Sequence, residues 1–216
     1  MIHLENIVKT YRTKTGTVKA LDNMNFKVNE GEFVVITGPS GSGKTTLLMT
    51  IAAMLRPTSG SVCVAEKNLY EMTATDRTKF RAETIGFVFQ MFYLIPYLNV
   101  MENIAIAGKN CKKNDIEKIL EKLNLQHRAY HKPSQLSVGE KQRTAVARVL
   151  INQPKIILAD EPTGNLDPEN ANEIFGYLAD FHRNKGTVIL VSHGIEALKF
   201  ASRTVCIKNG TIDNNK

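Results

Sequence analysis

The feature that most constrains this chain is a glycine-rich segment between two apolar runs. It fits the pattern G-x-x-x-x-G-K-[ST] and consists of Gly38, Pro39, Ser40, Gly41, Ser42, Gly43, Lys44, Thr45 and Thr46. Residues 33–37 before it are rich in β-branched and aromatic side chains and predict a buried strand, and the apolar residues 47–55 after it predict a buried helix. A strand, a glycine loop and a helix in this order direct backbone N–H groups and a helix N-terminus toward a bound phosphate.

The residue types within this segment predict separate roles. The glycines let the backbone curl without Cβ clashes. Lys44 is expected to reach the β- and γ-phosphates of a nucleotide, and the Thr45 hydroxyl is expected to bind Mg²⁺. A glycine-rich turn that merely enters a core helix is the alternative interpretation, but the flanking strand and helix favour phosphate binding.

A pair of carboxylates follows a later apolar run. Residues 155–159 predict a buried strand, and Asp160 and Glu161 come directly after it. In α/β sheets, ligands bind at the carboxyl ends of parallel strands. Asp160 is therefore expected to orient the Mg²⁺ shell, and Glu161 to polarise a water as a general base. A single carboxylate here would more often be a cap or a surface residue, but the pair favours catalysis.

Other predicted strands end in polar groups in the same way. Residues 85–89 lead into Gln90, and residues 187–191 lead into Ser192 and His193. If all these strands are neighbours in one parallel sheet, their polar groups meet at one edge. Short strands are predicted within residues 1–37, a hairpin is predicted at 204–212, and helices are predicted at about 76–81, 114–123, 136–152, 168–183 and 195–200.

Composition narrows the class of protein. With 216 residues, 43% of them hydrophobic, the chain is expected to form a globular α/β domain. No apolar run approaches the ~20 residues that cross a bilayer, and the N-terminus has no signal-peptide pattern, so we expect an intracellular protein. The three cysteines lie far apart and suggest neither a metal site nor a disulfide. The net charge of +7 permits binding to nucleic acid or to an anionic membrane surface, but the basic residues are scattered, which favours a solvated surface.

Residues 92–107 contain more large apolar side chains than a loop-rich segment normally buries. Pro96 and Asn99 interrupt this stretch, and Leu94, Ile95 and Tyr97 lie near the interruptions. Part of the stretch is expected to be core. The excess of apolar side chains predicts a docking groove for a partner.

The motifs together resemble a known family. Residues 38–46, Gln90, 136–143, 156–162 and His193 occur in the order and spacing of an ABC-transporter ATP-binding subunit, over nearly the whole chain. Residues 160–167, with 87–90 and 94–96, look like the branch that includes lipoprotein-releasing, macrolide-export and cell-division ATPases. The resemblance implies an α/β fold: a P-loop NTPase core with a mostly parallel sheet, an N-terminal antiparallel β subdomain and a helical signature subdomain. It implies one domain over 1–216, with a core at about 1–89 and 136–216 and a helical insert at about 90–135.

The resemblance also implies roles around ATP and Mg²⁺. Tyr11 would stack on adenine, with Val18 packing beside it, although a tyrosine in such a polar stretch is more often a surface residue. Gln90 would contact Mg²⁺ and the attacking water, and would relay the nucleotide state to a membrane partner. His193 would contact the γ-phosphate and help hold the geometry for hydrolysis.

Dimerisation is a further implication of the resemblance. Two copies would enclose two Mg-ATP, with Ser137 and the amide of Gly139 reaching the γ-phosphate bound to the other copy and Asp167 crossing the interface. A separate membrane permease would dock near residues 90–98, on the cytoplasmic face of the cell membrane, and power export or release. The same ATP cycle in a mechanotransmission subunit, a non-transport soluble ABC ATPase and a non-hydrolysing ATP sensor are the alternatives, and no nucleic-acid partner is expected.

Three positions depart from the family pattern. Val138 stands where the family usually has glycine, Glu140 where it has glutamine, and Gly194 where an acidic residue is common. A carboxylate near a triphosphate is unfavourable. We therefore predict that Glu140 bends back onto the Ser137 N–H, forming a capping box at the start of the helix, and that turnover could be slow.

Overall fold

The strands that carry the predicted functional groups lie in one sheet. Within residues 1–14, 16–109 and 111–213, which the computed structural model describes, its order is β10-β9-β3-β8-β7-β6. These strands are β3 (Phe33–Thr37), β6 (Ile85–Val88), β7 (Ile156–Asp160), β8 (Thr187–Val191), β9 (Arg203–Lys208) and β10 (Thr211–Asp213). All neighbours pair in parallel except β9 and β10, which form the predicted hairpin. The carboxyl ends of β3, β6, β7 and β8 therefore share one edge.

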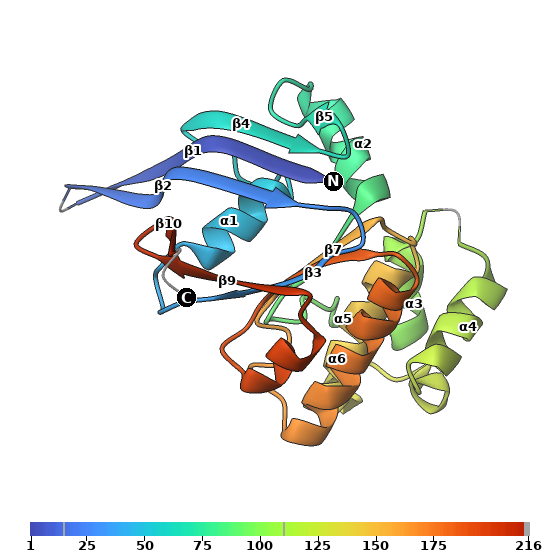
Figure 1. Ribbon diagram of the computed structural model, residues 1–216. Helices are drawn as coiled ribbons and strands as arrows, with labels where there is room; N and C mark the ends of the chain where they lie inside the picture. Colours follow the sequence, from blue (N-terminus) through green and yellow to red (C-terminus); the bar gives the residue numbers. More distant parts are fainter. Residues whose placement is uncertain (15, 110, 214–216) are drawn as a thin grey trace.

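Both faces of this sheet are buried, which explains the continuous apolar runs of its strands. In β3, Val34 and Ile36 pack into one core layer, and Phe33 and Val35 into the other. The first layer lies between the two sheets and contains α1 (Lys44–Ile51), as Figure 1 shows.

A second sheet covers α1 and has the order β2-β1-β4-β5. Its strands are β1 (Ile2–Thr13), β2 (Gly16–Val28), β4 (Ser59–Val64) and β5 (Lys67–Asn68), and their pairing is antiparallel. The prediction of several short strands within residues 1–37 is confirmed for 33–37 but was wrong for the part before it, because β1 and β2 form one long hairpin. Register shifts between Leu4 and Thr10 break the alternation of buried side chains, which made long strands resemble short ones.

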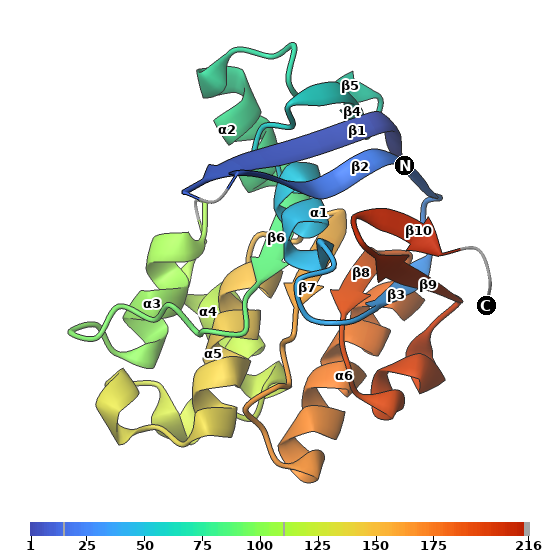
Figure 2. The same cartoon turned by 90° about the vertical axis from the view of Figure 1, so that its left-hand side faces the viewer.

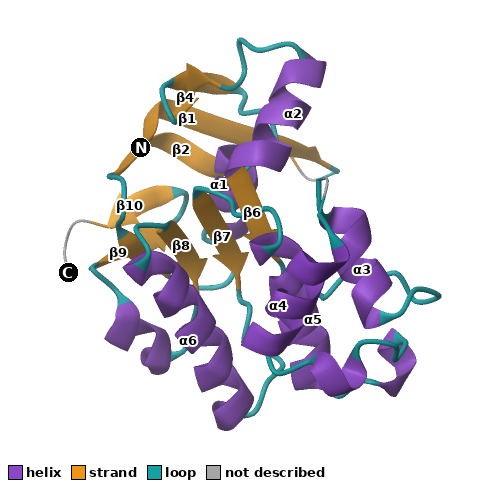
Figure 3. Cartoon of the chain, turned by 90° about the vertical axis from the view of Figure 1, so that its right-hand side faces the viewer, coloured by secondary structure: helices purple, strands orange, loops and turns teal. Residues whose placement is uncertain are grey.

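Helices cover the other face of the parallel sheet, opposite the antiparallel one (Figures 2 and 3). They are α3 (Val100–Ala107), α4 (Lys113–Lys122), α5 (Val138–Leu150) and α6 (Pro168–Arg183), and α2 (Ala74–Thr84) leads into β6. Short 3₁₀ turns lie at η1 (Gln126–Arg128), η2 (Pro133–Gln135) and η3 (Ile195–Phe200). In the described ranges, no helix has the length and apolarity needed to span a membrane.

Three predicted helices differ in detail. The helix predicted at 47–55 ends at Ile51, because Ala53 adopts a left-handed backbone with φ +57°. The helix predicted to start at Asn114 starts at Lys113, since the carboxylate of Asp115 accepts a hydrogen bond from the Lys112 N–H (2.9 Å). Residues 195–200 form a 3₁₀ helix rather than an α-helix.

Candidate active site

The glycine loop connects β3 to α1 in a conformation that only glycine allows at two positions. Gly38 has φ +140° and Gly43 has φ +105°. A Cβ on Gly38 would lie 2.0 Å from the Ile207 carbonyl oxygen, and one on Gly43 would lie 2.2 Å from the Ala20 carbonyl oxygen. Gly43 is also the N-cap residue, directly before the first residue of α1, and within the described residues no side chain caps this helix. Its first N–H groups are therefore available to an anion.

Lys44 is held over this loop. Its buried Nζ donates hydrogen bonds to the carbonyl oxygens of Gly38 and Pro39, each at 2.8 Å. The loop is anchored in turn to the β9–β10 hairpin, because the Gly210 N–H donates to the Ser42 carbonyl oxygen (3.0 Å). The ammonium group thus lies where it can exchange carbonyl partners for phosphate oxygens.

A cleft of about 560 Å³ collects side chains from all four strand ends. Among the predicted site residues, those that line it are Ser40, Gly41, Gly43, Lys44, Thr45, Thr46, Gln90, Asp160, Glu161 and His193. These segments are far apart in the sequence and meet because β3, β6, β7 and β8 are neighbours. Ala20, Gly164 and Val191 also line the cleft, and the sequence patterns did not single them out.

Asp160 offers an oxygen that suits a cation. Burial raises the pKa of its carboxyl, although the Thr45 hydroxyl and the Lys44 charge oppose this rise. Its Oδ1 is buried, and the described residues supply no hydrogen-bond partner for it. Hydroxyl, amide and carboxylate oxygens from Thr45, Gln90 and Asp160 form a donor set that fits Mg²⁺. In the described part of the chain, no three His, Cys, Asp or Glu side chains could hold a metal ion together.

Glu161 and His193 form a second pair in the cleft. Glu161 Oε1 lies 3.1 Å from His193 Nε2. Burial raises the pKa of the Glu161 carboxyl, and the neighbouring His193 partly offsets this. Glu161 has φ +47°, and its N–H donates to the Val191 carbonyl oxygen (3.0 Å), which fixes this left-handed backbone. Such conformations concentrate at functional sites, and the resulting geometry suits a general base.

The structure leaves two predicted adenine contacts outside this cleft. Tyr11 and Val18 are opposite each other in the β1–β2 pairing, and both side chains are exposed. Strand β2, which carries Val18, reaches the cleft only through Ala20. Pro39 is exposed at the loop, while Ser42 is buried beneath it.

Ser137 and Gly139 also lie outside this cleft, at the start of α5. The predicted capping box is confirmed: the Glu140 N–H donates to Ser137 Oγ (3.1 Å), and the Ser137 N–H donates to Glu140 Oε2 (2.7 Å). Glu140 therefore bends back as expected. Val138 is the first helical residue, and its side chain points to solvent.

Position 139 needs glycine for a packing reason that the sequence did not reveal. A Cβ at this position would lie 2.0 Å from Asn170 Oδ1. Asn170 is fixed there, because its Oδ1 accepts from Arg143 (3.0 Å) and its Nδ2 donates to Asp167 Oδ2 (2.6 Å). Asp167 in turn caps α6 through the Asn170 N–H (3.0 Å). The backbone of the first turn of α5 thus packs against a side chain from the first turn of α6.

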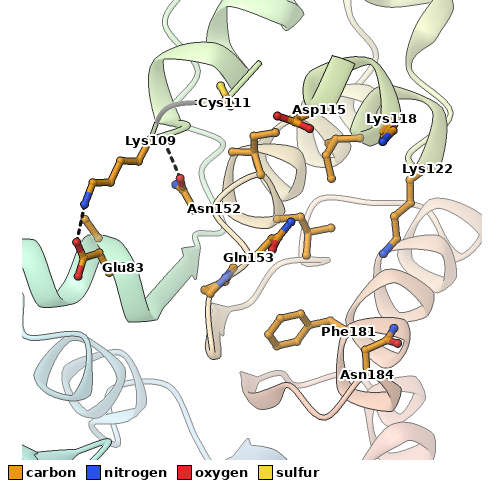
Figure 4. Close-up of a pocket in the computed structure, with 15 residues that line it drawn as sticks. Glu83, Lys109, Cys111, Asp115, Lys118, Lys122, Asn152, Gln153, Phe181 and Asn184 are labelled. Carbon is orange, nitrogen blue, oxygen red and sulfur yellow. Dashed lines mark hydrogen bonds and ion pairs between the residues drawn. The ribbon is translucent and has the colours of Figure 1, made fainter. Parts of the chain in front are cut away.

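A larger cavity of about 880 Å³ contains none of the predicted site residues. Figure 4 shows its lysines (Lys109, Lys118 and Lys122), with Lys109 paired to Glu83. The cavity also includes Gln153 and Pro154, which precede the amino end of β7, whereas the predicted groups lie at the carboxyl ends of the strands. Size therefore does not identify the site in this molecule, and the convergence of functional groups does.

Comparison with known proteins agrees with this geometry. The family model described as ABC transporter matches residues 21–164. An uncharacterized ABC transporter ATP-binding protein of Methanocaldococcus jannaschii, MJ0796, is 41% identical over 100% of this chain and 97% of its own length. Its dimeric post-hydrolysis structure with ADP and Pi matches with a TM-score of 0.92 at 37% identity, covering 99% of this chain and 97% of that one.

Two relatives have more specific names. The lipoprotein-releasing system ATP-binding protein LolD of Hyphomonas neptunium is 40% identical over 98% of this chain and 96% of its own. The macrolide export ATP-binding/permease protein MacB of Chlorobaculum tepidum is 38% identical over 100% of this chain, which spans 34% of that relative. The chain belongs to the ABC transporter ATP-binding family. It is an ATP-binding cassette and an ATPase, that is, an enzyme that hydrolyses ATP.

Proposed function

We propose that this chain dimerises around two Mg-ATP and powers a separate membrane permease in export or in lipoprotein, peptide or drug release. The observation that carries the proposal is the meeting of the glycine loop, Gln90, Asp160, Glu161 and His193 in one cleft. The proposal treats residues 1–216 as one domain with a helical insert at about 90–135, of which residues 15, 110 and 214–216 lie outside the described ranges.

Within the cleft, each group has one task. The loop amides and Lys44 bind the phosphates, and Thr45, Gln90 and Asp160 would hold Mg²⁺, which supplies charge neutralisation when bound. Glu161 accepts a proton from the attacking water. His193 contacts the γ-phosphate, and its Nε2 lies 3.1 Å from Glu161 Oε1.

The proposed dimer is supported by the positions of Ser137 and Gly139, which do not line the cleft of their own chain. Ser137 is exposed at the N-terminus of α5, and Gly139 is buried in its first turn. The Ser137 oxygen accepts a hydrogen bond from Glu140, so its hydroxyl hydrogen remains free to donate to a phosphate. The MJ0796 structure with ADP and Pi is dimeric. We propose that these donors complete the nucleotide site of a second copy.

The permease is proposed to dock on the loop after β6. This loop carries exposed Tyr93 and Tyr97, and Tyr93 lines a hollow of about 260 Å³. The middle of the loop is held in place: Asn103 Oδ1 accepts from the Ile95 N–H (2.8 Å), Asn103 Nδ2 donates to the Ile95 carbonyl (3.1 Å), and Arg148 donates to the Tyr93 carbonyl (2.6 Å). A rigid exposed aromatic loop joined directly to Gln90 can transmit the nucleotide state to a membrane partner. Such docking would put the protein at the cytoplasmic face of the membrane, as a peripheral subunit.

The test of the dimer uses Glu161→Gln. This variant should still bind ATP, hydrolyse it about 10²- to 10⁴-fold more slowly because the base is lost, and elute as a dimer from a sizing column in ATP. Addition of Lys44→Ala should return it to the monomer. A variant that hydrolyses at the parental rate, or that stays monomeric at saturating ATP, would contradict the proposal.

Docking is tested with Tyr97→Ala, since Tyr97 is 72% exposed. Leu94 and Ile95 are poorer choices, because Leu94 packs against the core and Ile95 is bonded to Asn103. Tyr97→Ala should keep basal hydrolysis and lose stimulation by the co-purified membrane partner. Tyr130→Ala, which removes an equally exposed tyrosine (73%), is the control and should keep both activities. Full stimulation of Tyr97→Ala would place the docking surface elsewhere.

A further inference from the structure

Glu140, the acidic residue within the family-like segment 136–143, is enclosed by partners from two segments. Glu140 is 7% exposed. Its Oε2 accepts from the Ser137 N–H (2.7 Å), and its Oε1 accepts from Arg128 Nε (2.7 Å). Arg128 belongs to η1, twelve residues earlier in the chain. The capping box thus accounts for one carboxylate oxygen, and Arg128 for the other.

This arrangement offsets an unfavourable electrostatic interaction. A carboxylate beside donors that bind a triphosphate would repel it. Burial would raise the pKa of the Glu140 carboxyl, but hydrogen bonds from Ser137 and Arg128 and the Arg128 charge outweigh burial and lower the pKa. Glu140 therefore stays ionised at neutral pH, and Arg128 supplies a positive charge beside it.

Arg128 is suited to be that charge. Its guanidinium keeps its charge at any physiological pH. Its side chain is 34% exposed, and its NH1 lies 3.3 Å from His131 Nε2, which fixes it from the other side. His127 is a weaker candidate, because its Nε2 lies 3.6 Å from Glu140 Oε1 and its side chain is mostly exposed.

We propose that Arg128 is a positioning residue for ATP hydrolysis, which neutralises Glu140 and holds the first turn of α5 so that Ser137 and Gly139 face the nucleotide of a second copy. This inference rests on the proposed ATP-dependent dimer. Without Arg128, Glu140 Oε1 is left with an uncompensated charge at the surface that approaches the γ-phosphate. The cost therefore falls on dimerisation and turnover, and ATP binding by the chain's own loop is spared.

The experiment is a double-mutant cycle of Arg128→Ala and Glu140→Gln in the full chain. Turnover is measured in the catalytically active protein, and ATP-dependent dimerisation is measured in the Glu161→Gln background. A fluorescent ATP analogue reports affinity in the monomer, and thermal melting reports folding. Arg183→Ala, which removes an exposed arginine paired with Asp180, is the matched control and should match the parent.

Arg128→Ala should lower kcat and dimer association about tenfold, the scale of one hydrogen bond to a charged group, with unchanged affinity for the analogue. Glu140→Gln added to Arg128→Ala should restore most of the loss, because the neutral amide has no charge to compensate. If Arg128→Ala equals the parent, or if the folded double variant is as impaired as Arg128→Ala, the inference is wrong.

Folding failure is also decisive. If Arg128→Ala does not fold, the double variant is compared with Glu140→Gln alone: equal turnover supports the inference, and lower turnover or a failure to fold overturns it. If Glu161→Gln stays monomeric in ATP, the proposed dimer falls and the inference falls with it. If that background dimerises and Arg128→Ala dimerises equally well, only the inference falls.

Discussion

The helices α1 and α5 both begin at a glycine-bearing segment proposed to bind phosphate, yet the two N-termini are built in opposite ways. At α1, the backbone of Gly43 is left-handed, and the described residues provide no side-chain cap and no acidic residue in the first turn. At α5, Ser137 and Glu140 cap each other, and the acidic residue is paired with Arg128. The first terminus leaves its donors for a ligand, whereas the second uses its own side chains to become rigid.

The difference teaches how one fold supplies two kinds of phosphate contact. An uncapped N-terminus can wrap around a phosphate chain, because its N–H groups have no competing partners. A self-capped N-terminus has fewer free donors, but those that remain, on Ser137 and Gly139, are held in fixed positions. The uncapped arrangement favours affinity for a phosphate chain. The self-capped arrangement favours recognition of a surface that is already formed before it binds.

The largest expected effect is the loss of affinity at the uncapped terminus. Lys44→Ala should weaken binding of a fluorescent ATP analogue to the monomer about 10- to 100-fold, because it removes hydrogen bonds to a charged ligand. Ser137→Ala should leave the monomer's affinity within about twofold, since Ser137 lies outside the chain's own cleft. Equal losses in the two variants would remove the distinction between the helices.

An effect on stability rather than on affinity is expected from packing at the capped terminus. Gly139→Ala should lower the free energy of unfolding by about 1–3 kcal/mol, because the new Cβ strikes Asn170, which Arg143 and Asp167 hold in place. Urea unfolding measures the loss, and Asn170→Ala in the same chain should recover part of it. Gly194→Ala is the control, since its Cβ would make only an ordinary contact, 3.5 Å from Ser192 Oγ. Unchanged stability of Gly139→Ala would show that the α5–α6 contact is adaptable.

The smallest expected effect is that Glu140 and Glu161 contribute to stability with opposite dependence on pH. The pKa of Glu140 is lowered in the folded protein, so its contribution to stability is present above the unfolded-state pKa and is lost as the pH falls through the folded-state pKa. The pKa of Glu161 is raised, so its contribution is present below the unfolded-state pKa and is lost as the pH rises through the folded-state pKa.

Melting curves between about pH 3 and pH 7, a range that spans the unfolded-state pKa of a glutamate, separate the two carboxylates. Glu140→Gln should reduce the loss of stability at the acid end. Glu161→Gln should instead raise the stability of the nucleotide-free protein relative to the parent toward pH 7. Profiles that shift in the same direction would mean that the two carboxylates share one kind of environment.

The sequence by itself determined the elements whose causes are local. The glycine loop follows from a pattern of nine residues, and the strands at 33–37 and 187–191 follow from apolar runs. The bent-back Glu140 follows from a capping box whose two residues are three positions apart. These features depend on backbone geometry and on side chains within one turn of one another, so the order of residues is enough to predict them. The resemblance to the ABC family added the roles of Tyr11, Val18 and His193, which remain predictions.

Only the tertiary structure decided the contacts between segments that are distant in the chain. The bulges that merge short patterns into β1 and β2, the packing of Asn170 on Gly139, and the pairing of Arg128 with Glu140 have no periodic signal in the sequence. The order of strands in the sheet decided which polar groups share a cleft. Such contacts depend on how whole layers pack, because a side chain meets a distant partner only after both elements have buried their apolar faces.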